Sequence, residues 1–89
     1  MHYAVALAPA AWRQVRRRPR EVQVKLTAAI EDLGTNPRPR GVVKLEATLH
    51  LYRVRVGDYR VIYQISDREA SVLVVKIGHR GSVYGKKGS

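Results

Sequence analysis

The stretch Leu51–Tyr63, LYRVRVGDYRVIY, decides the fold of this 89-residue chain. Two runs of alternating residues flank the pair Gly57-Asp58, and glycine readily adopts the positive φ of a two-residue hairpin turn. The pattern therefore predicts a β-hairpin centred on this pair. The predicted register pairs Val56 with Tyr59, Arg55 with Arg60, Val54 with Val61, Arg53 with Ile62, and Tyr52 with Tyr63.

Residues that pair across a hairpin share one face of the sheet, and successive residues point to opposite faces. One face carries only aromatic and β-branched side chains and is predicted to enter the core: Tyr52, Val54, Val56, Tyr59, Val61 and Tyr63. The other face gathers Arg53, Arg55 and Arg60. Because like charges placed opposite each other destabilise a hairpin, the pairing of Arg55 with Arg60 predicts an anionic partner.

The chain is strongly basic, with 17 Lys and Arg residues against 7 Asp and Glu residues and a formal net charge of +10. Twelve of the 17 cations are arginine, the side chain best suited to bidentate contacts with phosphate. A chain of this length forms one small domain, and its charge favours attraction to polyanions. Composition alone leaves two interpretations open, a nucleic-acid-binding surface and a solvated basic surface.

Several classes of site are excluded or disfavoured by the residues that are present. The chain has no cysteine, which excludes disulfides and thiolate metal sites. His2, His50 and His79 and the scattered acidic residues show no ligand spacing, so we expect no metal and no cofactor. No apolar run approaches the ~20 residues that span a membrane, and a signal-peptide pattern is lacking. We therefore expect a cytoplasmic protein that makes no membrane contact.

The first half of the chain predicts one strand and two helices. His2–Leu7 favours a strand, Pro9 suits the first turn of a helix, and that helix is predicted to turn Trp12 and Val15 to the core. A second helix is predicted to begin at Pro19 and to end at Gly34 as its C-terminal cap. Its apolar face carries Val22, Leu26, Ala29, Ile30 and Leu33. The two helices are expected to form an antiparallel hairpin.

The second half predicts an antiparallel sheet. After a loop over 35–41, Val42–Leu45 favours an edge strand, and Ser66–Ala70 favours a turn. Ser71–Gly78 is almost continuously apolar and is predicted to be a strand covered on much of both faces. The predicted fold is α+β: an N-terminal strand, an antiparallel helical hairpin, then a three- to four-stranded antiparallel sheet with its arginine face open. Residues 1–84 form the predicted domain and 85–89 a flexible tail.

Arg80 and Tyr84 follow the last long strand and are predicted to approach Arg53, Arg55 and Arg60 if that strand neighbours the hairpin. The chain has no paired carboxylates, Gly-rich phosphate loop or Ser/His/Asp order. A cluster of cations with a phenol suits metal-free phosphodiester cleavage, because fixed positive charge stabilises a phosphorane and a ring stacks on bases. A basic binding surface without chemistry is the alternative.

Three segments together resemble the RelE-type toxins of the RelE/ParE superfamily: YRVRVGDYRVIYQI, VLVVKIGHRGSVY, and KLEA at Lys44–Ala47. The resemblance covers essentially the whole chain. It implies a metal-independent endoribonuclease (an mRNA interferase) that cuts mRNA in the A site of the 70S ribosome, with contacts to 16S rRNA. It also implies a hetero-oligomer in which a RelB-like antitoxin holds the toxin inactive.

The resemblance further implies attack of a ribose 2′-OH on the adjacent phosphate, which leaves a cyclic phosphate and a 5′-hydroxyl. Arg60 and Arg80 would bind the phosphate and stabilise the transition state, while Arg53 and Arg55 would orient the substrate. Tyr84 would stack on a base or transfer a proton. Other cations are predicted to add affinity for RNA and the ribosome: Arg13, Arg16, Arg17, Arg20 and Lys44.

Two questions stay open at the level of sequence. Well-known members carry Lys at the positions of Arg53 and Arg55, and because Arg effectively never loses its proton, the general base is unassigned. His79 is a candidate for proton transfer, although neighbours in a strand point to opposite faces. The superfamily also contains ParE-like toxins, which inhibit DNA gyrase without nuclease activity, so that function is the alternative. A degenerate toxin that only binds its antitoxin is a third.

Overall fold

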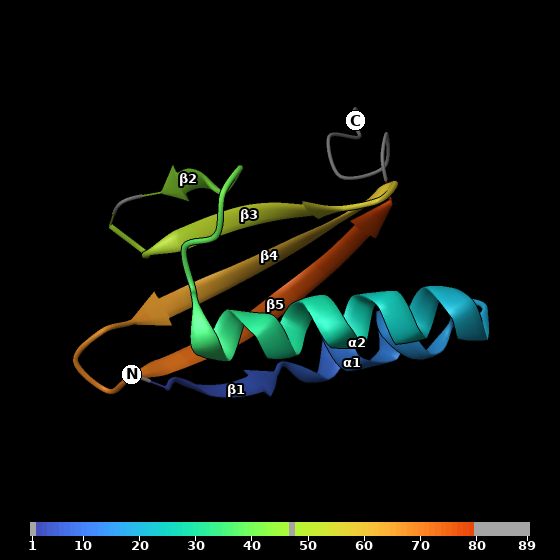
Figure 1. Cartoon of the computed structure of the whole chain (residues 1–89), viewed down its shortest axis with the longest axis horizontal. Helices are drawn as coiled ribbons and strands as arrows, with labels where there is room; N and C mark the ends of the chain where they lie inside the picture. The colour runs from blue at the N-terminus through green and yellow to red at the C-terminus, as the bar shows by residue number, and fades with distance from the viewer. Residues whose placement is uncertain (1, 47, 80–89) are drawn as a thin grey trace.

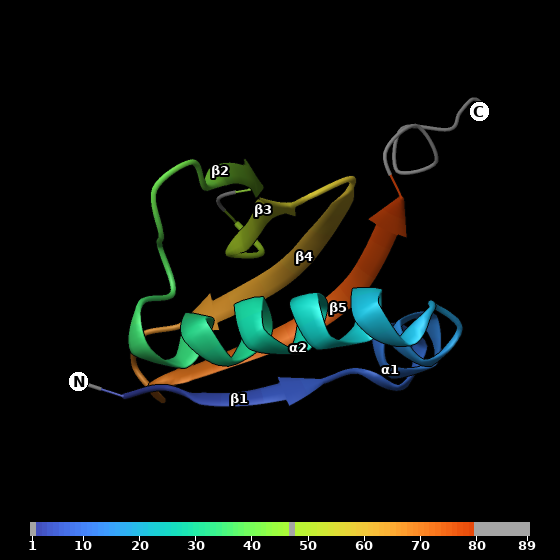
Figure 2. The ribbon, with the colours of Figure 1, turned by 45° about the vertical axis from the view of Figure 1, so that its right-hand side comes forward.

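The computed structural model describes residues 2–46 and 48–79 as two helices and one five-stranded sheet. Its elements, in chain order, are β1 (Ala4–Leu7), α1 (Pro9–Arg16), α2 (Arg20–Thr35), β2 (Val43–Glu46), β3 (Leu51–Val56), β4 (Tyr59–Ser66) and β5 (Ser71–His79). The strands are ordered β1-β5-β4-β3-β2, and the helices lie on one face of the sheet (Figures 1 and 2). The predicted α+β class with a helical hairpin is confirmed.

The strand count differs from the prediction because β1 joins the sheet. It pairs in parallel with the first half of β5, from Ala4 beside Ser71 to Leu7 beside Val74. Beyond that point α1 runs along the same edge of β5, and the Gln14 side-chain oxygen accepts a 2.8 Å hydrogen bond from the Ile77 amide. The backbone of β5 is therefore hydrogen-bonded on this edge first by a strand and then by a helix side chain.

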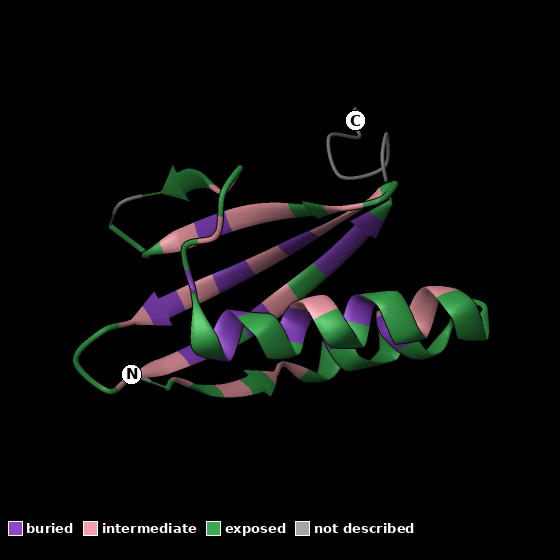
Figure 3. Ribbon diagram, in the orientation of Figure 1, coloured by how far each residue is buried: buried purple, intermediate pink, exposed green. Residues whose placement is uncertain are grey.

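The central hairpin forms in the predicted register, from Val56 opposite Tyr59 to Tyr52 opposite Tyr63. Gly57 has a φ of 60°, the left-handed conformation that the turn needs. Tyr52, Val61 and Tyr63 are buried, and Figure 3 shows the alternation of buried and more exposed residues along β3 and β4. The aromatic and β-branched face of the hairpin therefore packs toward the helices, as predicted, and the arginine face is open.

The prediction that the last strand is covered on both faces is wrong. A register shift opposite Ile62 and Tyr63 leaves Val75 as an extra residue in β5, a β-bulge. Val74 and Ile77 therefore both face the core, whereas Leu73 and Lys76 lie on the open face. Leu73 is 38% exposed because the helices cover only the other side of the sheet.

The packing of α1 also corrects the prediction. Trp12 is 53% exposed, and the helix buries Ala11 and Val15 instead. Trp12 with Val15 and Ala11 with Val15 both fit helical spacing. The small Ala11 side chain, however, lets the helix backbone approach the sheet more closely than an indole would allow. On α2 the predicted apolar face is confirmed, with Leu26, Ile30 and Leu33 buried.

Gly34 is not the C-terminal cap that the sequence predicts. It lies inside α2, which continues to Thr35, and it is buried against the N-terminal strand. A Cβ atom on Gly34 would lie 2.9 Å from the backbone oxygen of Tyr3. The Tyr3 amide also donates a 2.7 Å hydrogen bond to Gly34 O. Gly34 therefore permits close approach of helix and strand.

Substituting Gly34→Ala is expected to destabilise the protein by about 1–3 kcal/mol, because the clash is with backbone that cannot rotate away. Urea unfolding followed by circular dichroism measures the change. Thr35→Ala, on the exposed neighbouring position, is the matched control and should stay within about 0.5 kcal/mol of the parent. A Gly34→Ala variant as stable as this control would contradict the close-packing argument.

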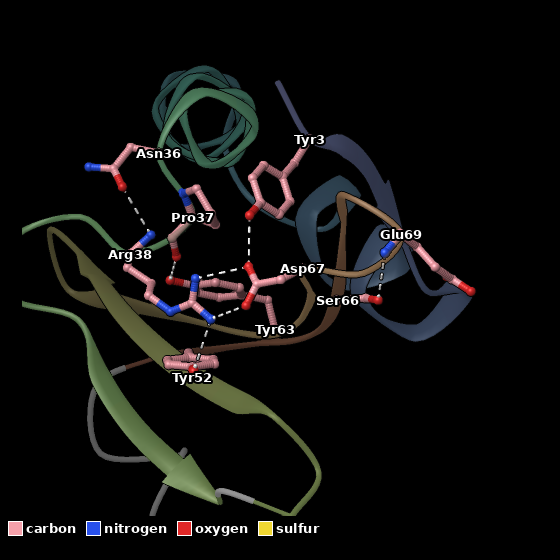
Figure 4. A network of polar contacts seen from close by, with 9 residues as sticks. All are labelled: Tyr3, Asn36, Pro37, Arg38, Tyr52, Tyr63, Ser66, Asp67 and Glu69. Carbon is pink, nitrogen blue, oxygen red and sulfur yellow. Dashed lines mark hydrogen bonds and ion pairs between the residues drawn. The ribbon is translucent and has the colours of Figure 1, made fainter. Parts of the chain in front are cut away.

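A polar network closes the end of the sheet that lies away from the hairpin turn (Figure 4). Arg38 forms a 2.9 Å ion pair with Asp67 and donates to the Tyr52 hydroxyl at 3.4 Å. The Tyr3 hydroxyl donates to Asp67 at 2.7 Å, and the buried Tyr63 hydroxyl donates to the Pro37 carbonyl at the same distance. These contacts connect the loop after α2 and the segment before β1 with β3, β4 and the β4–β5 turn.

These hydrogen bonds make stability depend on pH. Donation from Arg38, and then from Tyr3, lowers the pKa of Asp67 to about 2. This pKa is below the ~3.9 of an unfolded Asp. The Asp67 contacts therefore stabilise the folded protein fully above the unfolded pKa, and this stabilisation is lost as pH falls toward 2. Urea unfolding from pH 7 to pH 2 should show this loss.

The pH dependence is expected to flatten in Asp67→Asn and in Arg38→Gln, since each removes one partner of the ion pair. Arg40→Gln, an exposed cation in the same loop, should keep the parental dependence. Equal slopes in all of these variants would show that the Asp67 contacts do not couple to folding.

Within the described residues no helix is long and apolar enough to cross a membrane.

Candidate active site on the open face of the sheet

The hairpin places three predicted site residues on the sheet face opposite the helices. Arg55 lies directly across from Arg60, and Arg53 lies two residues before Arg55 on the same strand. Arg53 and Arg60 are half-buried, whereas Arg55 is exposed and its Nε donates a long 3.4 Å hydrogen bond to Gly57 O. The structure therefore brings these three arginines together, as the alternation of the hairpin predicts.

A fourth cation, Lys76, belongs to this face and was missed by the sequence analysis. It pairs with Ile62, which in turn pairs with Arg53, so the three side chains form one row across the sheet. The next row contains Arg55, Arg60 and Gly78. The bulge at Val75 reverses the alternation within the apolar run, and for this reason the strand pattern did not place Lys76 with the arginines.

Gly78 lies beside Arg60 in the sheet. It is the cross-strand partner of Arg60, carries no side chain and is buried. We define the basic open face as Arg53, Arg55, Arg60 and Lys76 with Gly78 beside them. Four cations on one surface can bind phosphate groups and stabilise negative charge that develops during a reaction.

The remainder of the open face mixes aliphatic and polar residues. Leu51, Ile62 and Leu73 lie on it by register, and so do Gln64, Ser66 and Ser71. The tyrosines of β3 and β4 all lie on the helix side instead. Stacking of a base on tyrosine would therefore come from outside these strands, and Tyr84 is the predicted residue.

Some predicted features lie outside the described residues. These are Arg80, Tyr84, the predicted tail 85–89, and Ala47 of the KLEA segment. His79 is the last described residue of β5 and pairs with Tyr59, so it points to the helix side. Its ring lies edge to face with the Tyr59 ring, at a centroid distance of 4.9 Å. The described structure does not bring the imidazole to the basic open face.

The cations predicted to bind RNA or the ribosome occupy a different surface. Arg13, Arg16, Arg17 and Arg20 are exposed on α1, at the α1–α2 turn and at the start of α2. Arg16 lies over the exposed Trp12 ring at 6.0 Å, and Lys44 of β2 lies 5.9 Å from the Tyr52 ring, on the helix side. The protein thus carries basic residues on both sides of its sheet.

A metal site is not formed by the described residues. Within residues 2–46 and 48–79, no group of three His, Asp or Glu side chains is arranged to hold an ion.

Comparison with known proteins identifies the family. A model described as the ParE toxin of type II toxin-antitoxin system, parDE, matches residues 5–84. A protein named toxin RelE1 from Methanocaldococcus jannaschii is 33% identical over 63 residues, which are 67% of this chain and 70% of the relative. Toxin RelG of Mycobacterium tuberculosis is 27% identical over 88 residues, 94% of this chain and 98% of the relative.

The solved structures agree. The archaeal RelE–RelB complex from Pyrococcus horikoshii matches with a TM-score of 0.82 and 31% identity, covering 91% of this chain and 98% of the other. The chain therefore belongs to the RelE/ParE toxin superfamily of type II toxin–antitoxin systems, as a RelE-type member. The resemblance found in its hairpin and last strand is confirmed.

Proposed function

We propose that the chain is a ribosome-dependent endoribonuclease that cleaves mRNA in the A site without a metal ion. The observation that carries the proposal is the pairing of Arg55 with Arg60 on a sheet face that also holds Arg53 and Lys76. Cations gathered on one surface favour the binding of an anion. A single-stranded RNA backbone supplies that anion, and the family makes an RNA substrate the natural candidate.

The proposed reaction is an internal transesterification. The ribose 2′-oxygen attacks the adjacent phosphorus, the bond from phosphorus to the 5′-oxygen breaks, and the 2′-OH proton ends on the departing 5′-oxygen. The products are a 2′,3′-cyclic phosphate and a 5′-hydroxyl, and no water is consumed. Arg60, together with Arg80, stabilises the doubly charged phosphorane, while Arg53 and Arg55 orient the chain. Lys76 adds a phosphate contact, and Tyr84 stacks on a base or transfers the proton.

The helix-side cations have a separate role in this proposal. Arg13, Arg16, Arg17 and Arg20 are exposed on the helices and the turn between them, and not on the strands that form the basic open face. Folded ribosomal RNA that surrounds the protein can contact both sides at once. These residues, with Lys44, would then contribute affinity through counterion release and would not affect the chemical step.

Primer extension on a message translated in the presence of the protein tests the proposal. We expect new 5′ ends at codon positions in the A site, and cleavage only when ribosomes translate the message. Intact mRNA together with loss of DNA supercoiling by gyrase would instead support the ParE-like alternative. Intact mRNA, active gyrase and normal growth on induction would indicate a degenerate toxin.

The proposed partner is a RelB-like antitoxin in a cytoplasmic hetero-oligomer. The P. horikoshii structure is a complex of a RelE with a RelB. Acidic side chains in such a partner would complement the +10 net charge of this chain. Co-expression of the neighbouring small open reading frame should restore growth and yield a co-purifying complex, and failure of both would remove this partner from the proposal.

A further inference from the structure

Three side chains contact one another in series at the end of the molecule where α2 begins and β5 ends. They are Arg18 of the α1–α2 turn, Tyr59 of β4 and His79 of β5, here called the Arg18 stack. The Cζ atom of Arg18 lies 5.1 Å from the Tyr59 ring centroid. The Tyr59 and His79 rings meet at 81°, with 4.9 Å between their centroids. Figures 1 and 2 show the α1–α2 turn, the β3–β4 turn and the end of β5 at this same end of the molecule.

The backbone around Arg18 is held in place from both helices. Its amide donates to Val15 O at 3.0 Å, and its carbonyl accepts a 2.7 Å hydrogen bond from the Gln23 side chain. Its Nε atom is buried and has no hydrogen-bond partner among the described residues. Such an atom requires an explanation in a native structure. Contact of the guanidinium with the Tyr59 ring offsets part of this cost, as a cation over an aromatic face does.

The backbone partners of β5 change along its length. β1 pairs with β5 as far as Val74, and on the same edge the Gln14 side chain accepts a hydrogen bond from the Ile77 amide. Beyond Ile77, β5 pairs with β4 through Gly78 and His79. Gly78 contributes no side-chain packing. The contact of His79 with Tyr59 therefore anchors the last described residue of the strand through its side chain.

We propose that Arg18, Tyr59 and His79 are positioning residues that fix the end of β5 for the reaction. The inference rests on the proposed function, in which Arg80, the residue directly after His79, stabilises the transition state. Restraint of His79 limits the displacement of its neighbour, and a misplacement of about 1 Å in an active site can cost ~10²-fold in rate. The Arg18 stack thus acts through Arg80 and does not itself contact RNA.

Two substitutions distinguish this positioning role from proton transfer by His79. Tyr59→Leu removes the ring contacts and leaves the imidazole in the chain. His79→Phe keeps an edge-to-face ring pair and removes the titratable group. Positioning predicts that the first variant is impaired and the second is rescued, whereas proton transfer predicts the reverse.

Single-turnover cleavage on saturating translating ribosomes is the experiment. We expect Tyr59→Leu to reduce the rate by at least about tenfold with ribosome affinity unchanged, because orientation is lost and binding is not. Tyr59→Phe and His79→Phe should cleave within about threefold of the parent, since both preserve the ring pair. A proton-transfer role would instead cost His79→Phe about 10²–10⁴-fold.

An NMR measurement on the whole protein tests the stack without activity. The His79 ring protons should show a ring-current shift that is kept in Tyr59→Phe and lost in Tyr59→Leu. Thr27→Ala, an exposed change on α2, controls for general effects of substitution, and thermal unfolding confirms that each variant folds.

The outcomes separate the inference from the function on which it rests. A parental protein that cleaves no mRNA would overturn both. If the parent cleaves mRNA and a folded Tyr59→Leu variant cleaves at the same rate, the positioning role alone is overturned. Loss of cleavage in His79→Phe beside that result would support proton transfer by His79.

Discussion

Substitution of Arg60 by alanine is expected to slow mRNA cleavage by about 10²–10³-fold at saturating ribosome, because loss of one well-placed charged donor removes that much transition-state stabilisation. Arg60 sits between Arg55 and Gly78 in its row of the sheet, so a phosphate bound at the basic open face would lie close to it. The charge on phosphorus oxygens increases as the 2′-oxygen attacks. The loss should therefore appear in the single-turnover rate and less in ribosome affinity. Under the proposed mechanism Arg80→Ala behaves in the same way.

Arg16→Ala provides the matched control, since it removes the same side chain from the helix-side surface. A contact that acts by counterion release weakens ribosome binding, reduces its salt dependence, and leaves the saturated rate unchanged. Cleavage by Arg60→Ala at the parental rate once binding is saturated would show that Arg60 only docks the protein.

The sequence predicted the structure best where strict alternation of residues along two strands and one turn determine the register. In the central hairpin, strict alternation and Gly57 at the turn leave a single register that buries Tyr52 and Tyr63, and that register forms. On α1 the same kind of argument was ambiguous. Ala11 with Val15 and Trp12 with Val15 both satisfy helical spacing, and the distance between helix and sheet, which is a tertiary property, selects the smaller residue.

Prediction of the candidate site was limited by the register between neighbouring strands. The common face of Arg53, Arg55 and Arg60 follows from the hairpin alone. The placement of Lys76 on that face and of His79 on the other depends on the bulge in β5, and no residue type in the run VLVVKI marks its position. The close packing of Gly34 against the Tyr3 backbone and the Val5 side chain likewise cannot be predicted before β1 is placed in the sheet.

Substitution of Arg55 by glutamate is expected to change stability and activity in opposite directions. The new carboxylate would face Arg60 across the hairpin, and an opposite-charge pair in this position contributes roughly 0.2–1 kcal/mol relative to a neutral one. The same change places negative charge where the RNA phosphate is proposed to bind. Cleavage should fall by at least about 10²-fold, because a cationic contact is lost and a repulsive one is added.

Urea unfolding and single-turnover cleavage of the same preparations measure the two effects. Arg68→Glu makes an identical change of charge in the exposed β4–β5 turn, so it controls for net charge and should alter cleavage little. Arg55→Gln should lie between the parent and Arg55→Glu in both measurements, since it removes the repulsion without adding an attraction. If Arg55→Glu is more stable and still cleaves at the parental rate, the like-charge pair does not serve RNA binding. If Arg55→Glu is less stable and inactive, replacing the like-charge pair does not stabilise the fold. The pairing of Arg55 with Arg60 would then not lower stability in exchange for RNA binding.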